Sequence, residues 1–110
     1  MTSTVPPGPG RIPVRIDPDL ADLIPGYLDK RRQDIAAVRE ALDRQAYDAI
    51  RTTGHKMKGS GGGYGFDRIT EIGAALEAAA RETDNTRIRA SLQDLADYLD
   101  RIDIAYEQPD

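Results

Sequence analysis

Apolar residues recur at steps of three and four along most of this chain, beginning near Asp17, and no segment rich in β-branched or aromatic residues alternates with period two. Such spacing is typical of amphipathic helices, each of which buries one apolar stripe. Pro25 should separate a short first helix from a longer second one, because proline removes a backbone donor and disfavours helix in the residue before it. The apolar residues of these two segments are Leu20, Leu23, Ile24, Tyr27, Leu28, Ile35, Val38 and Leu42.

Capping residues and glycines mark the ends of three further helical segments. Asp67 is the expected N-cap of one, and Asp84 or Asn85 is the expected N-cap of the last. The segment before Asp67 is ended by glycines no later than Gly65. The apolar residues of the three segments are Tyr47, Ile50 and Met57; Ile69, Ile72, Leu76 and Ala79; and Ile88, Leu92, Leu95, Leu99, Ile102 and Tyr106. With short connections, this order predicts an all-α fold, an antiparallel four-helix bundle with a short additional N-terminal helix.

The length and composition fit one soluble domain. Of 110 residues, 39% are hydrophobic and 31% are charged, and no apolar run is long enough to cross a bilayer. The opening MTSTVPPGPGRIP is rich in proline and small residues and lacks the pattern of a signal peptide. We therefore expect a disordered tail over residues 1–14, a helical domain over residues 15–110, and a cytoplasmic location without membrane attachment.

Charge and rare residues exclude several kinds of chemistry. The net charge of -4, from 15 basic and 19 acidic side chains, argues against broad nucleic-acid binding. Cysteine is absent, so disulfides and thiolate sites are excluded. His55 is the single histidine, which rules out a metal site with several histidines. We expect the chain to bind no metal or cofactor.

The only histidine lies on the exposed side of the third helical segment. His55 is about 200° around the helix axis from Met57 and about 140° from Ile50, so burying those two residues turns the imidazole outward. The stretch between Asp48 and Asp67 contains no acidic residue but three cations, namely Arg51, Lys56 and Lys58. Positive charge is therefore concentrated around the only imidazole of a chain whose net charge is negative.

The neighbours of His55 suggest phosphoryl chemistry. A neutral imidazole is a competent nucleophile toward an activated phosphoryl group, and Lys58, one turn away, would stabilise charge on the transferring oxygens. Arg51 lies one turn before it, and Gly59 and Gly62 on the same face would let a partner's backbone approach closely. Two plainer interpretations stay open at this point. A surface histidine near lysines is commonplace, and the glycine run also fits a flexible loop that ends the helix.

The segment HKMKGSGGGYG resembles the signature of histidine-containing phosphotransfer (HPt) domains. In that family the histidine is followed by lysine, glycine and a later glycine at plus three, four and ten, which here are Lys58, Gly59 and Gly65. On the next helix, two apolar family positions and one polar position are occupied by Ile69, Leu76 and Glu77. The resemblance covers about residues 16–106. Gly54 replaces the usual alanine, and we expect it to loosen the helix beside His55.

The resemblance implies a phosphorelay. His55 would take a phosphoryl group from the aspartate of a response-regulator receiver domain and pass it to another, in a pathway that includes a hybrid histidine kinase. Lys58 and Arg51 would steady the phosphate, and Glu77 would contact and orient the imidazole. Magnesium would belong to the receiver. The chain would act as a monomeric phosphotransfer intermediate without autonomous kinase activity.

Two other kinds of function stay open on the sequence. A docking module of the same architecture would bind or inhibit a receiver domain or a histidine kinase without ever being phosphorylated. A purely structural helical bundle would bind neither. For Glu77, the alternative is an ordinary solvated carboxylate on a helix surface.

Overall fold

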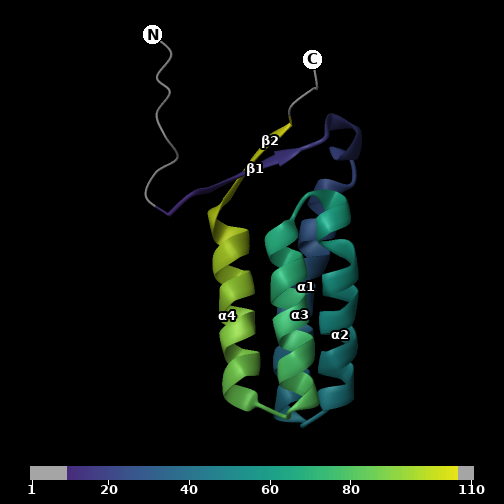
Figure 1. The fold of residues 1–110 in the computed structure, drawn as a ribbon, viewed down its shortest axis with the longest axis vertical. Helices are drawn as coiled ribbons and strands as arrows, with labels where there is room; N and C mark the ends of the chain where they lie inside the picture. Colours follow the sequence, from purple (N-terminus) through teal and green to yellow (C-terminus); the bar gives the residue numbers. More distant parts are fainter. Residues whose placement is uncertain (1–9, 107–110) are drawn as a thin grey trace.

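Four antiparallel helices form the body of the protein. The computed structural model describes residues 10–106. Its helices are α1 (Ile24–Asp43), α2 (Tyr47–Ser60), α3 (Asp67–Arg81) and α4 (Asn85–Arg101). Successive helices run in opposite directions and pack side by side (Figure 1). The predicted all-α helical bundle is thus confirmed in its main architecture.

The predicted additional N-terminal helix is wrong. A short strand, β1 (Ile12–Ile16), and a 3-10 turn (Pro18–Leu20) precede the bundle instead. Pro25 lies in the first turn of α1 and does not divide two helices. The reason is that backbone N–H groups in a helix's first turn have no intrahelical acceptor, so a proline there removes no bond and its fixed φ suits the helix.

A two-stranded parallel sheet closes one end of the bundle (Figure 1). The last helix stops at Arg101 and does not continue to Tyr106, because residues 102–106 form strand β2 (Ile102–Tyr106). The pairing with β1 runs from Ile12 opposite Ile102 to Ile16 opposite Tyr106. Part of the expected disordered tail, residues 12–14, therefore belongs to a strand, whereas residues 1–9 and 107–110 lie outside the described residues.

The helices bury the apolar stripes that the sequence predicts. Ile50, Met57 and Leu95 have no exposed surface, and Phe66 joins them from the connection between α2 and α3. The side chain of Asp84 caps α4 by accepting a hydrogen bond from the Arg87 N–H, as expected. Asp67 is not the N-cap of α3; it is the first helical residue, and Phe66 precedes it without a side-chain cap bond. An acidic residue in the first turn still complements the helix dipole.

The connection between α2 and α3 contains the glycine run. Helix α2 ends at Ser60, a 3-10 turn spans Gly62–Tyr64, and Gly65 follows with a φ of 92°. Only glycine adopts that left-handed conformation without strain. The glycines therefore end the helix by Gly65, as predicted. No helix in the described part of the chain is long and apolar enough to cross a membrane.

Candidate functional site

His55 projects from the outer face of α2, in the half of the helix nearer its C-terminal end. Its side chain is 69% exposed, whereas Gly54 and Met57 on the other side of the helix are buried. The exposure predicted from the helical angles is confirmed. The imidazole is therefore open to a large partner.

A buried carboxylate from α3 holds the imidazole. The Nδ1 atom of His55 lies 3.0 Å from Oε2 of Glu77, and the Glu77 side chain is only 6% exposed. An ionised carboxylate can only accept a hydrogen bond, so the neutral imidazole donates from Nδ1 and keeps its lone pair on Nε2. Glu77 thus fixes both the ring orientation and the nitrogen that is free to react.

Two cations also bind the same carboxylate. Lys58 Nζ lies 3.4 Å from Glu77 Oε1, and an Arg81 guanidinium nitrogen lies 3.3 Å from Oε2. Burial by itself raises the pKa of the Glu77 carboxyl, but the hydrogen bonds from His55 and Lys58 and the nearby positive charges outweigh it, so the pKa lies below the ordinary glutamate value. Glu77 is consequently ionised at neutral pH.

Replacing Glu77 by glutamine should destabilise the protein in a pH-dependent way. Because the folded-state pKa is lowered, the stabilisation by the carboxylate is present above the unfolded-state pKa, about 4.3, and is lost as the pH falls through the folded-state value. The free energy of unfolding of Glu77→Gln should thus be below that of the wild type at neutral pH, with a gap that closes in acid. Urea titrations at several pH values measure this gap.

Glu82→Gln provides the matched control for that series. Glu82 follows the same helix, but its side chain is 63% exposed and it pairs with the exposed Arg87. Exposed ion pairs contribute little to stability, so this variant should stay close to the wild type throughout. If the free energies of unfolding of wild type and Glu77→Gln differ by the same amount from neutral to acid pH, Glu77 is not stabilised as an ionised carboxylate by its three partners.

Arg51 and Arg81 border an open hollow beside the imidazole. This hollow of about 300 Å³ is lined by Arg51, Thr52, His55, Glu77 and Arg81. Within the described residues, Arg51 has no hydrogen-bond or ion-pair partner, so its guanidinium is available to an incoming anion. Lys58 does not line the hollow and reaches Glu77 from one turn further along α2. The predicted residues His55, Glu77, Lys58 and Arg51 are thus neighbours, arranged around one imidazole.

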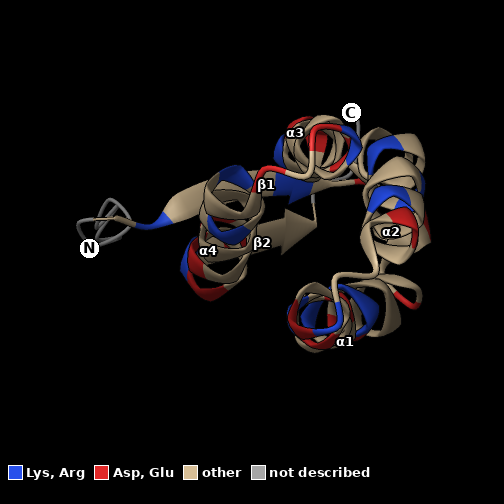
Figure 2. Cartoon of the chain, turned by 90° about the horizontal axis from the view of Figure 1, so that it is seen from below, with Lys and Arg blue, Asp and Glu red and all other residues tan. Residues whose placement is uncertain are grey.

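Arg81 belongs to this group but was not predicted from the sequence. It stands four residues after Glu77 on α3, and pairs at this spacing face each other on a helix. That signal was available once Glu77 was singled out. Figure 2 shows Lys and Arg positions recurring along α2, beside α3. The cationic surface around His55 therefore draws on both helices.

The glycines near His55 fall into two groups. A Cβ built on Gly54 would lie 2.7 Å from the Glu77 backbone nitrogen, and one on Gly61 would lie 2.6 Å from that of Thr70. These glycines let α2 and α3 approach closely, a role for Gly54 that the sequence did not suggest. By contrast, a Cβ on Gly59 would meet nothing within 4 Å, and one on Gly62 would make only ordinary contacts. Internal packing therefore does not require glycine at these two exposed positions.

A comparison with protein-family models matches the Hpt domain over residues 22–105, which is most of the chain. The chain belongs to the Hpt domain family. Members are phosphotransfer modules of two-component signalling that interact with receiver domains and histidine kinases. No curated protein and no solved structure matched this sequence.

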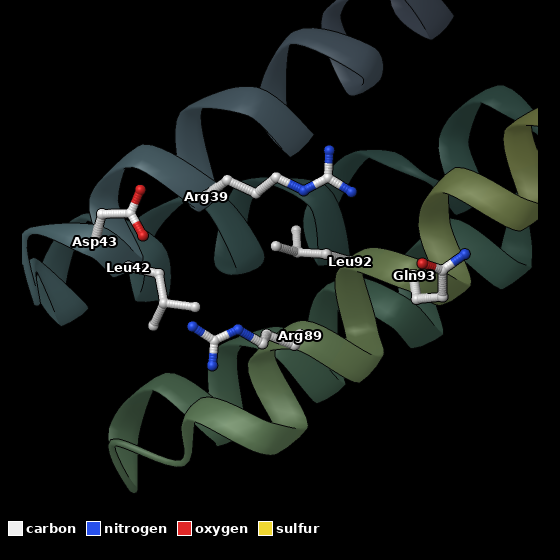
Figure 3. A pocket seen from close by; sticks show the side chains of 6 residues that line it. All are labelled: Arg39, Leu42, Asp43, Arg89, Leu92 and Gln93. Atoms are coloured by element: carbon white, nitrogen blue, oxygen red, sulfur yellow. The ribbon is translucent and has the colours of Figure 1, made fainter.

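A second hollow in this Hpt domain contains no histidine. It has a volume of about 380 Å³ and lies between α1 and α4 (Figure 3), lined by Arg39, Leu42, Asp43, Arg89, Leu92 and Gln93. None of these side chains is a histidine. Across the described residues, no group of three or more acidic or histidine side chains could hold a metal ion. The hollow on the α2–α3 face, in contrast, is lined by His55.

Proposed function

We propose that this Hpt domain relays phosphoryl groups between receiver-domain aspartates through His55. The observation that carries the proposal is the pairing of an exposed imidazole with a buried, ionised carboxylate. Because Glu77 occupies Nδ1, Nε2 is the nitrogen that presents its lone pair to a partner. Imidazole nitrogens of this kind attack activated phosphoryl groups.

The transfer step balances without a further reactant. The Nε2 lone pair attacks the phosphorus of a receiver's aspartyl phosphate, the N–P bond forms, and the bond from phosphorus to the aspartate oxygen breaks. The leaving aspartate recovers its negative charge, and the imidazole becomes positively charged while keeping its Nδ1 proton. Glu77 stabilises that charge at 3.0 Å. In the second step another receiver's aspartate attacks the phosphorus and the neutral imidazole leaves.

Cations around the imidazole would stabilise the transferring group. Arg51 lines the hollow beside His55, and Lys58 is half exposed although its Nζ contacts Glu77. Both would attract the phosphoryl oxygens in the transition state. The same charges complement the acidic, magnesium-binding pocket of a receiver domain, which mainly raises the encounter rate. The domain itself would need no metal and would have no kinase activity of its own.

Gly59 and Gly62 would give the partner access. Both positions are exposed on the His55 side of α2 and the turn that follows, and glycine within a helix costs about 1 kcal/mol relative to alanine. Since the protein's own packing does not use the missing side chain at Gly59, close approach by a receiver backbone explains its presence. Response-regulator receivers and a hybrid histidine kinase are the partners that this surface fits.

Transfer from a phosphorylated receiver domain tests the proposed function. We expect radiolabelled phosphate to move from the receiver to this chain and to form a bond that is labile in acid and stable in alkali, as a phosphorus–nitrogen bond is. Binding measured in parallel separates the alternatives. Receiver binding without labelling would instead support a docking module that is never phosphorylated, and neither binding nor labelling would support a structural bundle. Either result would contradict the relay.

A further inference from the structure

A buried polar cluster on α1 faces the end of α2, away from the imidazole itself. Arg31 and Asp34 are only 8% and 6% exposed, and the Arg31 Nε donates to Asp34 Oδ2 at 2.7 Å. Lys30 adds a second, longer contact to the same carboxylate from the surface. Of the ion pairs among the described residues, this is the one in which both side chains are buried.

The cluster extends from α1 to the last residue of α2. Arg31 donates to the Ser60 hydroxyl at 3.4 Å, and the Tyr27 and Ser60 hydroxyls lie 2.9 Å apart. The Arg31 guanidinium also lies over the Tyr27 ring, 4.5 Å from its centroid. Tyr27 in turn stacks on Tyr64 at 4.2 Å between centroids. Helix α1 therefore contacts both ends of the segment from Ser60 to Tyr64.

The other side of this segment is held by α3. The Thr70 hydroxyl accepts a hydrogen bond from the Gly62 N–H at 2.9 Å and donates one to the Lys58 carbonyl at 3.1 Å. Exposed Gly59 lies between these two attachments, and exposed Gly62 supplies the N–H group of one of them. The surface assigned above to partner access is thus a turn fixed from both sides by directional polar contacts.

Stability alone does not explain a buried ion pair at this position. Desolvation of two charges often cancels their attraction, and well-packed apolar residues of similar size commonly stabilise a protein as much or more. Hydrogen bonds differ from apolar packing because they specify distance and direction. Arg31 contacts the Ser60 hydroxyl directly, and it contacts Tyr27, which stacks on Tyr64. The Arg31–Asp34 pair is therefore suited to setting the position of the turn.

We propose that Arg31 and Asp34 are positioning residues for the Ser60–Phe66 turn. They hold Gly62, and with it the neighbouring Gly59, at a fixed place relative to His55 without touching the imidazole. The link to phosphotransfer rests on the proposed function, whereas the ordering of the turn does not. Loss of the pair should therefore loosen the turn and weaken receiver docking, while the chemical step at His55 continues.

The double variant Arg31→Met with Asp34→Leu tests this proposal. It removes both charges together, so that no unpaired buried charge is left. We expect a urea unfolding midpoint equal to or above that of the wild type, and amide hydrogen exchange at Gly62, Gly65 and Phe66 faster by about tenfold. In transfer assays, the receiver's KM should rise about tenfold with kcat within about twofold, the signature of lost docking.

A surface pair supplies the matched control. Glu82→Leu with Arg87→Met removes an exposed ion pair of 2.7 Å far from the turn in sequence, and it should leave turn exchange and KM unchanged. The proposal would be overturned if the folded double variant at Arg31 and Asp34 showed the same amide hydrogen exchange in the turn and the same KM as the wild type. A fall in kcat at constant KM would also overturn it, because that would place the pair in the chemical step.

Ser60→Ala tests the same idea with the ion pair left intact. It deletes the hydroxyl that both Tyr27 and Arg31 contact, and it should speed exchange in the turn in the same direction by a smaller factor. Unchanged exchange in this variant would contradict the proposal. Exchange is measured on the free protein. A chain that fails to accept phosphate would therefore refute the relay while leaving the ordering of the turn testable.

Discussion

Label transfer from a phosphorylated receiver is expected to fall to background when His55 is replaced by glutamine. Glutamine is polar and of similar length, and its amide can still contact Glu77, but an amide nitrogen has no lone pair available to attack phosphorus. The side chain is 69% exposed, so the fold should be kept. Radiolabel on the chain and circular dichroism measure the two effects. Label that persists in a folded His55→Gln variant would show that another residue is the acceptor.

Lys58→Ala is the control that distinguishes the attacking nucleophile from a residue that only stabilises charge. Lys58 supplies charge stabilisation but no bond to phosphorus, so transfer should slow by about tenfold, with labelling still complete at long times. The residue is half exposed, which limits the size of the effect. An unchanged initial rate would remove Lys58 from the mechanism without affecting the assignment of His55.

Gly73→Ala should be the most damaging substitution of a single methyl group. A Cβ at this position in α3 would meet the Lys58 backbone nitrogen, and it would lie 2.8 Å from the Gly54 carbonyl oxygen and 2.9 Å from the Met57 carbonyl carbon. These are backbone atoms of α2 that no side-chain rotation can move. Overpacking of this kind costs about 2 kcal/mol or more, even after the gain in helix propensity. Urea unfolding measures the loss.

Gly59→Ala is the matched control within the facing helix. Its added methyl group would enter open space, so the same chemical change should stabilise the protein by up to about 1 kcal/mol. Receiver docking should weaken, since the methyl group occupies the surface assigned to the partner. Equal stability changes for Gly59→Ala and Gly73→Ala would contradict the close approach of α2 and α3 as the reason for Gly73.

The four helices were predictable because their apolar stripes are long and regular. Residues such as Ile50, Met57 and Leu95 are buried as their spacing indicates. The two strands were not predicted, because each has only five residues and pairs with a segment at the far end of the chain. The expectation that no such segment alternates with period two was wrong, because apolar residues do alternate in IPVRI and IDIAY. Over so few positions, however, the second segment also fits the spacing of a continuing helix.

The candidate site was predictable to a different extent. The exposure of His55 followed from helical angles alone, because the two apolar residues on its helix fix the buried side. The contact with Glu77 was expected only from the family resemblance, since it joins different helices and depends on how closely they pack. That distance is set by Gly54 and Gly73. Local sequence patterns do not reveal which glycines serve a neighbouring helix.

The parallel pairing of β1 with β2 also bears on the order of folding. Residue 12 lies opposite residue 102, so forming this sheet first would close nearly the whole chain into a loop, at an entropic cost that grows with loop length. Each pair of successive helices closes only a short loop, and two strands alone are barely stable in water. We therefore expect the sheet to form after the bundle has brought its ends together, and to open first on unfolding. The contacts of Glu77 with His55, Lys58 and Arg81 involve no residue of either strand, so early opening of the sheet should leave them in place.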